Sequence, residues 1–329
     1  MIAVLGSGSW ATAIVKIISE NNSKILWWVR EPEIAESVAR HGRNPLYLKQ
    51  CQLDASKIIV ETDIRKVIRT TDEIVLVIPS AFVSKSLEGL TREDFRGKRI
   101  YSAVKGIVPE TNQIVAEYLQ THFGVELQSQ AVISGPSHAE VVAQEGLTFL
   151  AVASPNQEMA EYMANNIRSS YVKVFTHEDM CGIEYGAVLK NIYAVAMGVA
   201  KGLSYGDNAL AVLISNAMQE MNAVLNELHP VSERCLEHFA YLGDLLVTAY
   251  SQHSRNRTFG NMIGMGYSIQ SAQLEMKMVA EGYYATKCMY EILSERNVYP
   301  PIIKALYRIL YEGCSPHWEM QHLFHQELQ

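Results

Sequence analysis

In the first half of the chain, short apolar runs alternate with stretches of helical pattern. The apolar runs are continuous, which is typical of strands that are buried on both faces of a parallel sheet. We expect eight strands, over residues 2–5, 24–29, 58–60, 73–78, 99–103, 131–134, 149–153 and 172–175. The helices expected between them cover residues 10–20, 33–40, 63–70, 81–89, 111–120 and 156–168.

From about Asp179 onward, almost the whole chain has a helical pattern. We expect helices over residues 183–201, 208–228, 232–241, 270–280, 283–295, 302–312 and 317–328. This change of pattern marks a domain boundary near residues 178–182, although no Pro/Gly-rich linker lies there. The sequence therefore predicts an α/β domain over residues 1–179 and an all-helical domain over residues 180–329.

The composition excludes several classes of protein. The 329 residues include 28 basic and 35 acidic side chains, a net charge of −7, and 48% are hydrophobic, enough for a sizeable core. The acidic balance argues against nucleic-acid binding, because no basic stripe is present to neutralise phosphates. Five scattered cysteines, with no pair at metal-ligand spacing, indicate a reduced cytoplasmic protein without a metal site. We expect no targeting segment and no membrane insertion, because the apolar runs fall far short of the roughly 20 residues that span a bilayer.

The first strand runs directly into a glycine-rich turn. Residues 6–11 read Gly-Ser-Gly-Ser-Trp-Ala, and a helical pattern follows. This G-x-G-x-x-A spacing between a strand and a helix is the fingerprint of dinucleotide binding. Gly6 permits the tight turn, Gly8 lets the backbone approach a pyrophosphate, and Ala11 is small enough for close packing of helix on strand. The alternative is a glycine-rich turn that binds nothing.

The residue after the second strand indicates which dinucleotide is bound. An acidic side chain there accepts the ribose hydroxyls of NAD, whereas an arginine can hold the 2′-phosphate of NADP. The residue is Arg30, followed by Glu31 and Glu33. The sequence therefore favours NADP without excluding NAD, unless Arg30 is only a solvated loop charge.

Lys190 and Asn191 lie in a stretch, residues 182–196, that is apolar on nearly every face of a helix. Such a helix is buried. Burial depresses the pKa of a lysine, because desolvation penalises the charged form, and a depressed pKa suits a general acid/base near neutral pH. The alternative is that Lys190 reaches the rim of the core or pairs with Glu184.

Residues 254–257, Ser-Arg-Asn-Arg, combine cationic, hydroxyl and amide donors, which suits a phosphate monoester. The alternative is a solvated basic loop. Two other loops, at Lys105 and Ser137, directly follow predicted strands, where ligands of open α/β sheets bind.

With these residues assembled, the chain resembles the bacterial-type NAD(P)-dependent glycerol-3-phosphate dehydrogenases, as a divergent member. The resemblance covers nearly the whole chain and follows the family's order of motifs. The nine motifs are residues 6–10, 44–48 (Asn-Pro-Leu-Tyr-Leu), 79–80, 105–107, 135–137, 184–191, 206–209, 243–245 and 254–257.

The resemblance implies a Rossmann-type dinucleotide-binding domain followed by an all-helical domain, with the active site between them. It also implies reversible reduction of dihydroxyacetone phosphate to sn-glycerol 3-phosphate by NADH or NADPH, which feeds glycerophospholipid synthesis. Lys190 would accept the proton in the oxidation direction. The substrate would be held by Lys105, Gly135, Ser137, Asp244, Ser254, Arg255 and Asn256. With Gly6 and Gly8 of the turn, the cofactor would be bound by Ser9, Trp10, Arg30, Lys105, Ala139, Arg255, Val279 and Glu281.

The chain departs from the family's pattern at four places. Ala11 stands where the family usually has a third glycine, His138 where it has Phe, and Ser215-Asn216-Ala217 where it has Thr-Arg-Gly, so a buried arginine is missing. The family's Ala-Gly-x-Gly-Asp run is reduced to Tyr-Leu-Gly-Asp at residues 241–244. A homodimer is an open expectation.

Two alternatives to this assignment also stay open. One is another dehydrogenase of the same architecture that acts on a β-hydroxyacid or sugar acid, and the basic run at 254–257 argues against its carboxylate substrate. The other is a non-catalytic NAD(P)-binding protein, and the presence of both Lys105 and Lys190 argues against it, because a binder has no need of a costly buried lysine.

Overall fold

The structure is a computed structural model that describes residues 1–22, 24–276 and 280–328. The chain divides into two compact units. Unit 1 consists of Met1–Val104 and Gln113–Ile183, and unit 2 consists of Lys105–Asn112 and Glu184–Gln329. The predicted boundary at 179/180 lies four residues before the last residue of unit 1. The segment Lys105–Asn112 packs with unit 2 although it lies in the first half of the sequence, which no local pattern indicates.

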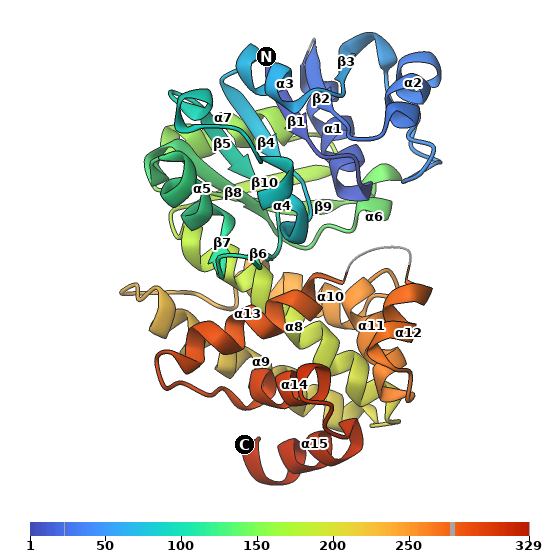
Figure 1. The fold of residues 1–329 in the computed structure, drawn as a ribbon, viewed down its shortest axis with the longest axis vertical. Helices are drawn as coiled ribbons and strands as arrows, with labels where there is room; N and C mark the ends of the chain where they lie inside the picture. The colour runs from blue at the N-terminus through green and yellow to red at the C-terminus, as the bar shows by residue number, and fades with distance from the viewer. Residues whose placement is uncertain (23, 277–279, 329) are drawn as a thin grey trace. The chain divides into compact units, whose positions relative to one another are not determined.

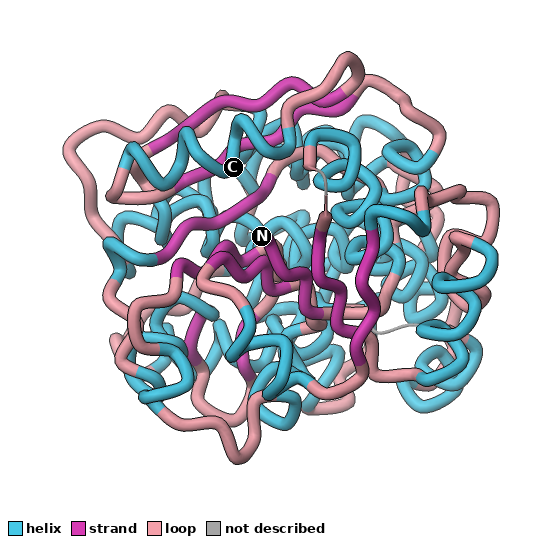
Figure 2. Tube along the Cα trace, turned by 90° about the horizontal axis from the view of Figure 1, so that it is seen from above, coloured by secondary structure: helices cyan, strands magenta, loops and turns pink. Residues whose placement is uncertain are grey.

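Unit 1 is built on an eight-stranded sheet with the order β10-β9-β8-β5-β4-β1-β2-β3. Its strands are labelled in Figure 1 and drawn in magenta in Figure 2. Each of the eight predicted strands is present within one or two residues. Their bounds are β1 Ile2–Leu5, β2 Ile25–Trp28, β3 Ile58–Glu61, β4 Glu73–Leu76, β5 Arg99–Ser102, β8 Gln130–Ser134, β9 Thr148–Ala153 and β10 Val172–His177.

Neighbouring strands of this sheet pair in parallel except for β8 and β9, which are antiparallel. The prediction of a parallel sheet is therefore wrong at this pair. The connection from β8 to β9 contains only the five-residue helix α6 (Ala139–Ala143). That helix is too short to carry the chain back to the start of β8, as a parallel crossover requires. Buried apolar runs do not encode strand direction.

The helices of unit 1 lie mostly where the pattern predicts them. Helix α1 directly follows the first strand, and Ile14, Ile17 and Ile18 on it are fully buried in the core of this unit. The predicted helix 81–89 is reduced to a 3-10 turn and the four-residue α4, and helix α6 is not predicted. The bounds are α1 Ser9–Asn21, α2 Pro32–His41, α3 Ile64–Thr70, α4 Val83–Ser86, α5 Val115–Phe123 and α7 Gln157–Ile167, with two short strands, β6 Ile107–Val108 and β7 Gln113–Ile114, before α5.

The second half of the chain is helical, as predicted, with two corrections. The predicted helix 232–241 is largely irregular and ends in a π-helical turn, Phe239–Gly243. Helices α10 and α11 are present where no helix is predicted. For α11 the reason is that the polar run at 254–257, where this helix begins, has the composition of a loop. The bounds are α8 Met180–Gly202, α9 Asp207–Leu228, α10 Asp244–Tyr250, α11 Arg255–Gly264, α12 Ile269–Glu275, α13 Glu281–Ser294, α14 Pro301–Tyr311 and α15 Pro316–His322, followed by a π-helical turn, Leu323–Glu327.

Helices α8 and α11 pack backbone to backbone. A Cβ at Gly198 of α8 would collide with the Arg257 carbonyl oxygen, and a Cβ at Gly260 of α11 would collide with the Val195 carbonyl oxygen. Glycine at both positions allows this close approach. The contact fixes the first turn of α11 beside α8, the helix that carries Lys190.

Helix α9 carries a buried acidic residue, Glu220, whose carboxyl oxygens accept hydrogen bonds from the backbone N–H groups of Ile302 and Ile303 at 2.7 and 3.1 Å. These N–H groups belong to the first turn of α14 and have no acceptor within their own helix. Burial raises the pKa of Glu220 to about 8, although the two N–H donors oppose the shift. At Asn216 on the same helix, where the resemblance implies an arginine, the amide donates to the Val212 carbonyl oxygen at 3.0 Å.

Candidate active site

The turn between β1 and α1 combines backbone donors with open space. Gly6 has a φ of +138°, and a Cβ there would collide with the Val77 carbonyl oxygen, so only glycine fits. A Cβ at Gly8 would meet nothing within 4 Å. The backbone N–H groups of residues 9–11 find no acceptor among the described residues. With the helix dipole, these free N–H groups favour an anion at the turn.

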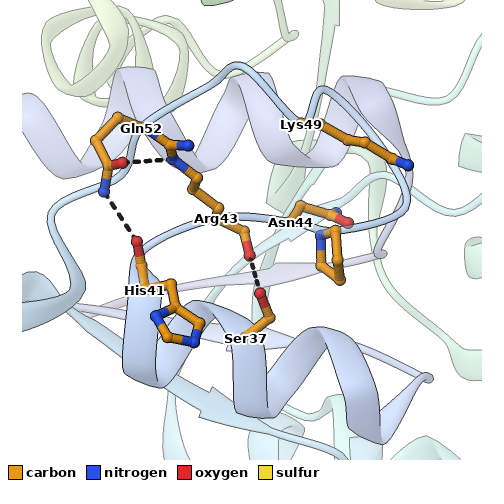
Figure 3. Close-up of a pocket in the computed structure, with 7 residues that line it drawn as sticks. Ser37, His41, Arg43, Asn44, Lys49 and Gln52 are labelled. Carbon is orange, nitrogen blue, oxygen red and sulfur yellow. Dashed lines mark hydrogen bonds between the residues drawn. The ribbon is translucent and has the colours of Figure 1, made fainter.

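The loop after α2 supports this turn. Asn44 is buried, and its Nδ2 donates to the Ser7 carbonyl oxygen and to Thr12 Oγ1, both at 2.9 Å. Beside Asn44, the loop and α2 form an open hollow of about 610 Å³ (Figure 3). The hollow is lined by Ser37, His41, Arg43, Asn44, Pro45, Lys49 and Gln52. It contains none of the predicted site residues, so it adds nothing to the predicted cofactor site.

Arg30 lies just after the end of β2, as predicted, with only Val29 between them. Its side chain is 69% exposed and forms an ion pair with Glu31. Its Nε and Nη2 donate to Glu31 Oε1 at 3.1 and 2.7 Å. Glu31 Oε2 accepts a hydrogen bond from Ser7 Oγ at 2.6 Å. The glycine turn is therefore bonded to an acidic side chain that the predicted site does not include.

The other predicted residues of unit 1 lie at the end of β8. Gly135 has a φ of +120°, and Ser137 Oγ donates to its carbonyl oxygen at 2.9 Å. Ala139 is buried and begins α6. Ser134 Oγ, at the last residue of β8, is buried and has no hydrogen-bond partner within the described ranges. The turn thus offers an unsatisfied hydroxyl next to the residues that the sequence assigns to the ligand.

Unit 2 brings together three predicted residues that are far apart in the sequence. Lys190 of α8 is buried, and its Nζ donates to Asp244 Oδ1 at 2.6 Å and to Thr248 Oγ1 at 2.9 Å. Lys105 Nζ donates to the other carboxylate oxygen of Asp244, Oδ2, at 3.0 Å. Asp244 begins α10 and is 1% exposed. One buried carboxylate therefore bonds two ammonium groups, and we refer to these three residues as the Lys–Asp–Lys cluster.

The environment of this cluster moves the pKa of Lys190 toward neutrality. Burial, the largest cause, lowers that pKa. The Asp244 carboxylate raises the pKa and the Lys105 ammonium lowers it, and together these effects bring it from 10.5 to about 7. Burial raises the pKa of Asp244, but the two ammonium groups outweigh it and hold the pKa below its usual range. Lys190 can therefore take up or release a proton near neutral pH while Asp244 stays ionised.

A chain of amide hydrogen bonds holds the backbone beside this cluster. Asn191 Nδ2 donates to the Lys105 carbonyl oxygen at 2.7 Å, and Asn191 Oδ1 accepts from Asn256 Nδ2 at 2.8 Å. Asn256 Oδ1 accepts from the Gly282 N–H at 2.9 Å. The side chain of Asn256 therefore works mainly within the protein, and one amide hydrogen is left for a ligand.

The predicted phosphate cradle is the first turn of α11. Ser254 is its N-cap, and Ser254 Oγ accepts from the Arg257 N–H at 3.3 Å. The backbone N–H groups of Arg255 and Asn256 have no acceptor in the described part of the chain. The exposed Arg255 guanidinium also has no hydrogen-bond or ion-pair partner there. The two N–H groups and the helix dipole thus favour an anion at this turn, and Arg255 adds a positive charge to it.

Comparisons with known proteins identify the family. The model of the NAD-dependent glycerol-3-phosphate dehydrogenase N-terminus matches residues 1–160, and that of its C-terminus matches residues 179–321. A glycerol-3-phosphate dehydrogenase [NAD(P)+] of Staphylococcus aureus is 34% identical over 315 residues, which cover 95% of this chain and 94% of that protein.

This chain belongs to the NAD-dependent glycerol-3-phosphate dehydrogenase family.

Solved structures of proteins with this name have the same fold. A glycerol-3-phosphate dehydrogenase of Coxiella burnetii superposes with a TM-score of 0.90 at 29% identity, covering 99% of this chain and 98% of that one. An enzyme of the same name from Saccharomyces cerevisiae has a TM-score of 0.81 at 23% identity and 99% coverage of both chains, which supports the fold alone. The predicted resemblance and the predicted fold class, a Rossmann-type domain followed by an all-helical domain, are confirmed.

The glycine turn fits the NAD or NADP that the family name implies. The free N–H groups of residues 9–11 and the open space at Gly8 suit a pyrophosphate. Trp10 Nε1 is buried and has no hydrogen-bond partner among the residues that the structure describes, so it is available to an acceptor on a ligand.

Not every predicted residue can be placed at the site. Val279 lies outside the described residues, and Glu281 is the first residue of α13. Sequence reasoning did not assign Thr248 or Asn191 to the site. Thr248 stands four residues after Asp244, on the same face of a helix, but this signal depends on predicting α10.

Within the described ranges, no group of three or more His, Cys, Asp or Glu side chains is arranged to hold a metal ion. No helix of these ranges has the length and apolar character needed to cross a membrane.

Proposed function

We propose that this chain transfers a hydride reversibly between NAD(P)H and C2 of dihydroxyacetone phosphate, with sn-glycerol 3-phosphate as the reduced product. The observation that carries the proposal is the buried Lys–Asp–Lys cluster, which holds a lysine of near-neutral pKa. The name of the Staphylococcus aureus relative, glycerol-3-phosphate dehydrogenase [NAD(P)+], supports this substrate and cofactor.

The bound cofactor supplies the hydride, and Lys190 donates or accepts the proton. As the hydride reaches C2, negative charge develops on the carbonyl oxygen, and the Lys190 ammonium donates a proton to it. In the reverse direction, the neutral amine takes the hydroxyl proton as the hydride leaves. With both lysines protonated, the two positive charges and the Asp244 carboxylate leave a net charge of +1 in the cluster, which favours the developing alkoxide.

The first turn of α11 is our proposed site for the substrate phosphate. The Arg255 side chain and the N–H groups of Arg255 and Asn256 supply charged and backbone donors. Phosphate binding at a point remote from C2 orients the carbonyl, so its energy contributes to kcat as well as to KM. Ser254 acts by capping this helix, and we propose Lys105, Gly135 and Ser137 as further substrate contacts.

The cofactor contacts proposed are the glycine turn with Gly6 and Gly8, together with Ser9, Trp10, Arg30, Lys105, Ala139, Arg255, Val279 and Glu281. We propose that residues 1–179 bind the dinucleotide and that residues 180–329 supply most of the substrate and proton-transfer groups. The glycine turn and the Lys–Asp–Lys cluster support this division, and Lys105 is its exception because it packs with unit 2.

The cellular setting is a further proposal. Five scattered cysteines, with no pair at metal-ligand spacing, support a reducing, cytoplasmic setting. The product would feed glycerophospholipid synthesis, as the resemblance implies. A homodimer is tested directly by size-exclusion chromatography with light scattering.

The phosphate site is tested by comparing dihydroxyacetone phosphate with dihydroxyacetone, which lacks the phosphate. Wild type should strongly favour the phosphorylated ketone. At saturating cofactor, Arg255→Ala should lower kcat/KM for dihydroxyacetone phosphate at least about tenfold, the loss of a hydrogen bond to a charged group, and should leave kcat/KM for dihydroxyacetone nearly unaffected. Because Arg255 is also a proposed cofactor contact, the variant should bind NAD(P)H more weakly. Arg255→Lys should not restore activity, because an ammonium lacks the planar fork that grips two phosphate oxygens.

Arg257→Ala is the matched control, because it removes the same charge from the same helical turn. It should keep the wild-type preference. If Arg255→Ala keeps the full preference for the phosphorylated ketone, the phosphate binds elsewhere. Oxidation of NADH, followed at 340 nm, with keto acids but not with dihydroxyacetone phosphate would favour the other dehydrogenase class, and no turnover with either would favour a non-catalytic binder.

A further inference from the structure

The glycine turn is bonded to Glu31, an acidic residue that neither the predicted nor the proposed cofactor site includes. Glu31 Oε2 accepts from Ser7 Oγ at 2.6 Å, and Ser7 stands between Gly6 and Gly8 of the turn. The side chain of Glu31 is 19% exposed, whereas that of Arg30 is 69% exposed. Of the two charged side chains after β2, the acidic one therefore bonds the turn and the basic one extends into solvent.

In dinucleotide-binding folds, an acidic side chain at this place accepts the hydroxyls of the adenosine ribose, because the ribose lies beside the glycine turn. A carboxylate accepts two such hydrogen bonds and repels the negative charge of a 2′-phosphate. Burial raises the pKa of Glu31, but Ser7 and Arg30 outweigh it and hold the pKa below its usual value. Glu31 is therefore ionised at neutral pH.

Arg30 does not offset this preference. Its Nε and Nη2 are already bonded to Glu31 Oε1, so the fork that would grip a phosphate is partly occupied. Together the two side chains carry no net charge, one positive and one negative, and so offer no net attraction to a 2′-phosphate.

We propose that Glu31 selects NAD over NADP, by accepting hydrogen bonds from the adenosine ribose hydroxyls and excluding a 2′-phosphate. This specificity rests on the proposed function, since it requires that unit 1 bind the dinucleotide. It is the opposite of the preference that Arg30 alone favours in the sequence.

The test measures binding of NADH and NADPH to the full chain by the fluorescence of the reduced nicotinamide, without any substrate. Wild type should bind NADH at least about tenfold more tightly than NADPH, the effect of hydrogen bonds to a charged group. Glu31→Gln should weaken the binding of NADH about tenfold and strengthen the binding of NADPH. The nucleotides 5′-AMP and 2′,5′-ADP, the second of which carries the 2′-phosphate, can be compared as competitors of NADH. Wild type should bind 5′-AMP more tightly than 2′,5′-ADP, and Glu31→Gln should lose this preference.

Glu33→Gln is the matched control, because it removes the same charge from an exposed acidic residue in the first turn of α2. It should leave the ratio of the two dissociation constants unchanged. Ser7→Ala removes the hydroxyl that holds Glu31 and should shrink the ratio only a few-fold. A wild type that prefers NADPH, or a Glu31→Gln variant that weakens both cofactors equally, would overturn the proposal.

The outcomes also separate this proposal from the proposed function. Tight NADH binding that depends on Glu31, together with no reduction of dihydroxyacetone phosphate, would support the role of Glu31 and contradict the function. Activity with a cofactor ratio that Glu31→Gln does not change would support the function and contradict the role of Glu31. Failure of wild type to bind either dinucleotide would overturn both.

Discussion

Lys105 places a second positive charge beside Lys190, and removing that charge tests the electrostatics of the site. The two Nζ atoms bond different oxygens of the Asp244 carboxylate, at 3.0 and 2.6 Å. Both positive charges therefore face one carboxylate, and the Lys105 charge lowers the pKa of Lys190. At an effective dielectric constant of about 20, Coulomb's law gives about 4 kcal/mol for two unit charges about 4 Å apart, so a neighbouring positive charge can shift a pKa by more than one unit.

Lys105→Met should therefore raise the pKa of Lys190 above its value of about 7, because the repulsion disappears and Asp244 is left to pair with Lys190 alone. In glycerol 3-phosphate oxidation, Lys190 works as the neutral amine. The rise of kcat with pH should therefore shift to higher pH, by at least about one unit. The assay is the pH dependence of kcat at saturating substrate and cofactor, which separates this effect from weaker binding.

Lys105→Arg is the control, since it keeps a positive charge at the same place. Its kcat profile should stay within about half a pH unit of wild type, a residual shift below 1 kcal/mol. If the profile of Lys105→Met coincides with that of wild type, the Lys105 charge does not set the pKa of Lys190 and the reasoning fails.

Three further predictions concern glycines and the buried acid. Gly260→Ala should lower Tm by several degrees and reduce kcat/KM, because a Cβ would collide with the Val195 carbonyl oxygen and shift α11; an unchanged Tm would contradict this packing. Gly6→Ala should destabilise the fold, whereas Gly8→Ala should keep the wild-type Tm and weaken NADH binding about tenfold or more, and equal effects of the two on Tm would count against the turn geometry. The pKa of Glu220, about 8 against 4.5, means that the folded state keeps a proton that the unfolded state loses, so wild-type stability should fall as pH rises from 5 to 8; thermal unfolding of Glu220→Gln should lack this fall.

Local sequence patterns predict much of unit 1 because its strands are buried and its helices amphipathic. They do not predict the antiparallel pairing of β8 and β9, which depends on how short the connection is rather than on the strands themselves. They also miss α11, whose helical form depends on the Ser254 cap and on close packing of Gly260 against α8. Tertiary contacts, not propensity, decide the structure at these two places.

A site residue can be predicted where its side chain is unusual for its surroundings in the sequence. It is much harder to predict where the site depends on a contact between distant segments. Lys190 stands out because it interrupts an apolar helix, and its partner is Asp244 rather than Glu184. The resemblance implies Lys105 and Asp244, but their shared carboxylate contact joins segments 139 residues apart, which no local pattern reveals. Thr248 completes the contacts of Lys190 and carries no signal of its own.

The central claim is that Lys190 transfers the proton that accompanies the hydride, and Lys190→Met tests it most directly. The measurement is kcat for NADH oxidation with dihydroxyacetone phosphate, followed at 340 nm, alongside the dissociation constant of NADH and the circular dichroism of the variant. The variant should fold and bind NADH as wild type does, while kcat falls at least about 10²-fold, the low end for loss of an acid/base group. A folded Lys190→Met variant that turns over within a few-fold of wild type would contradict the account.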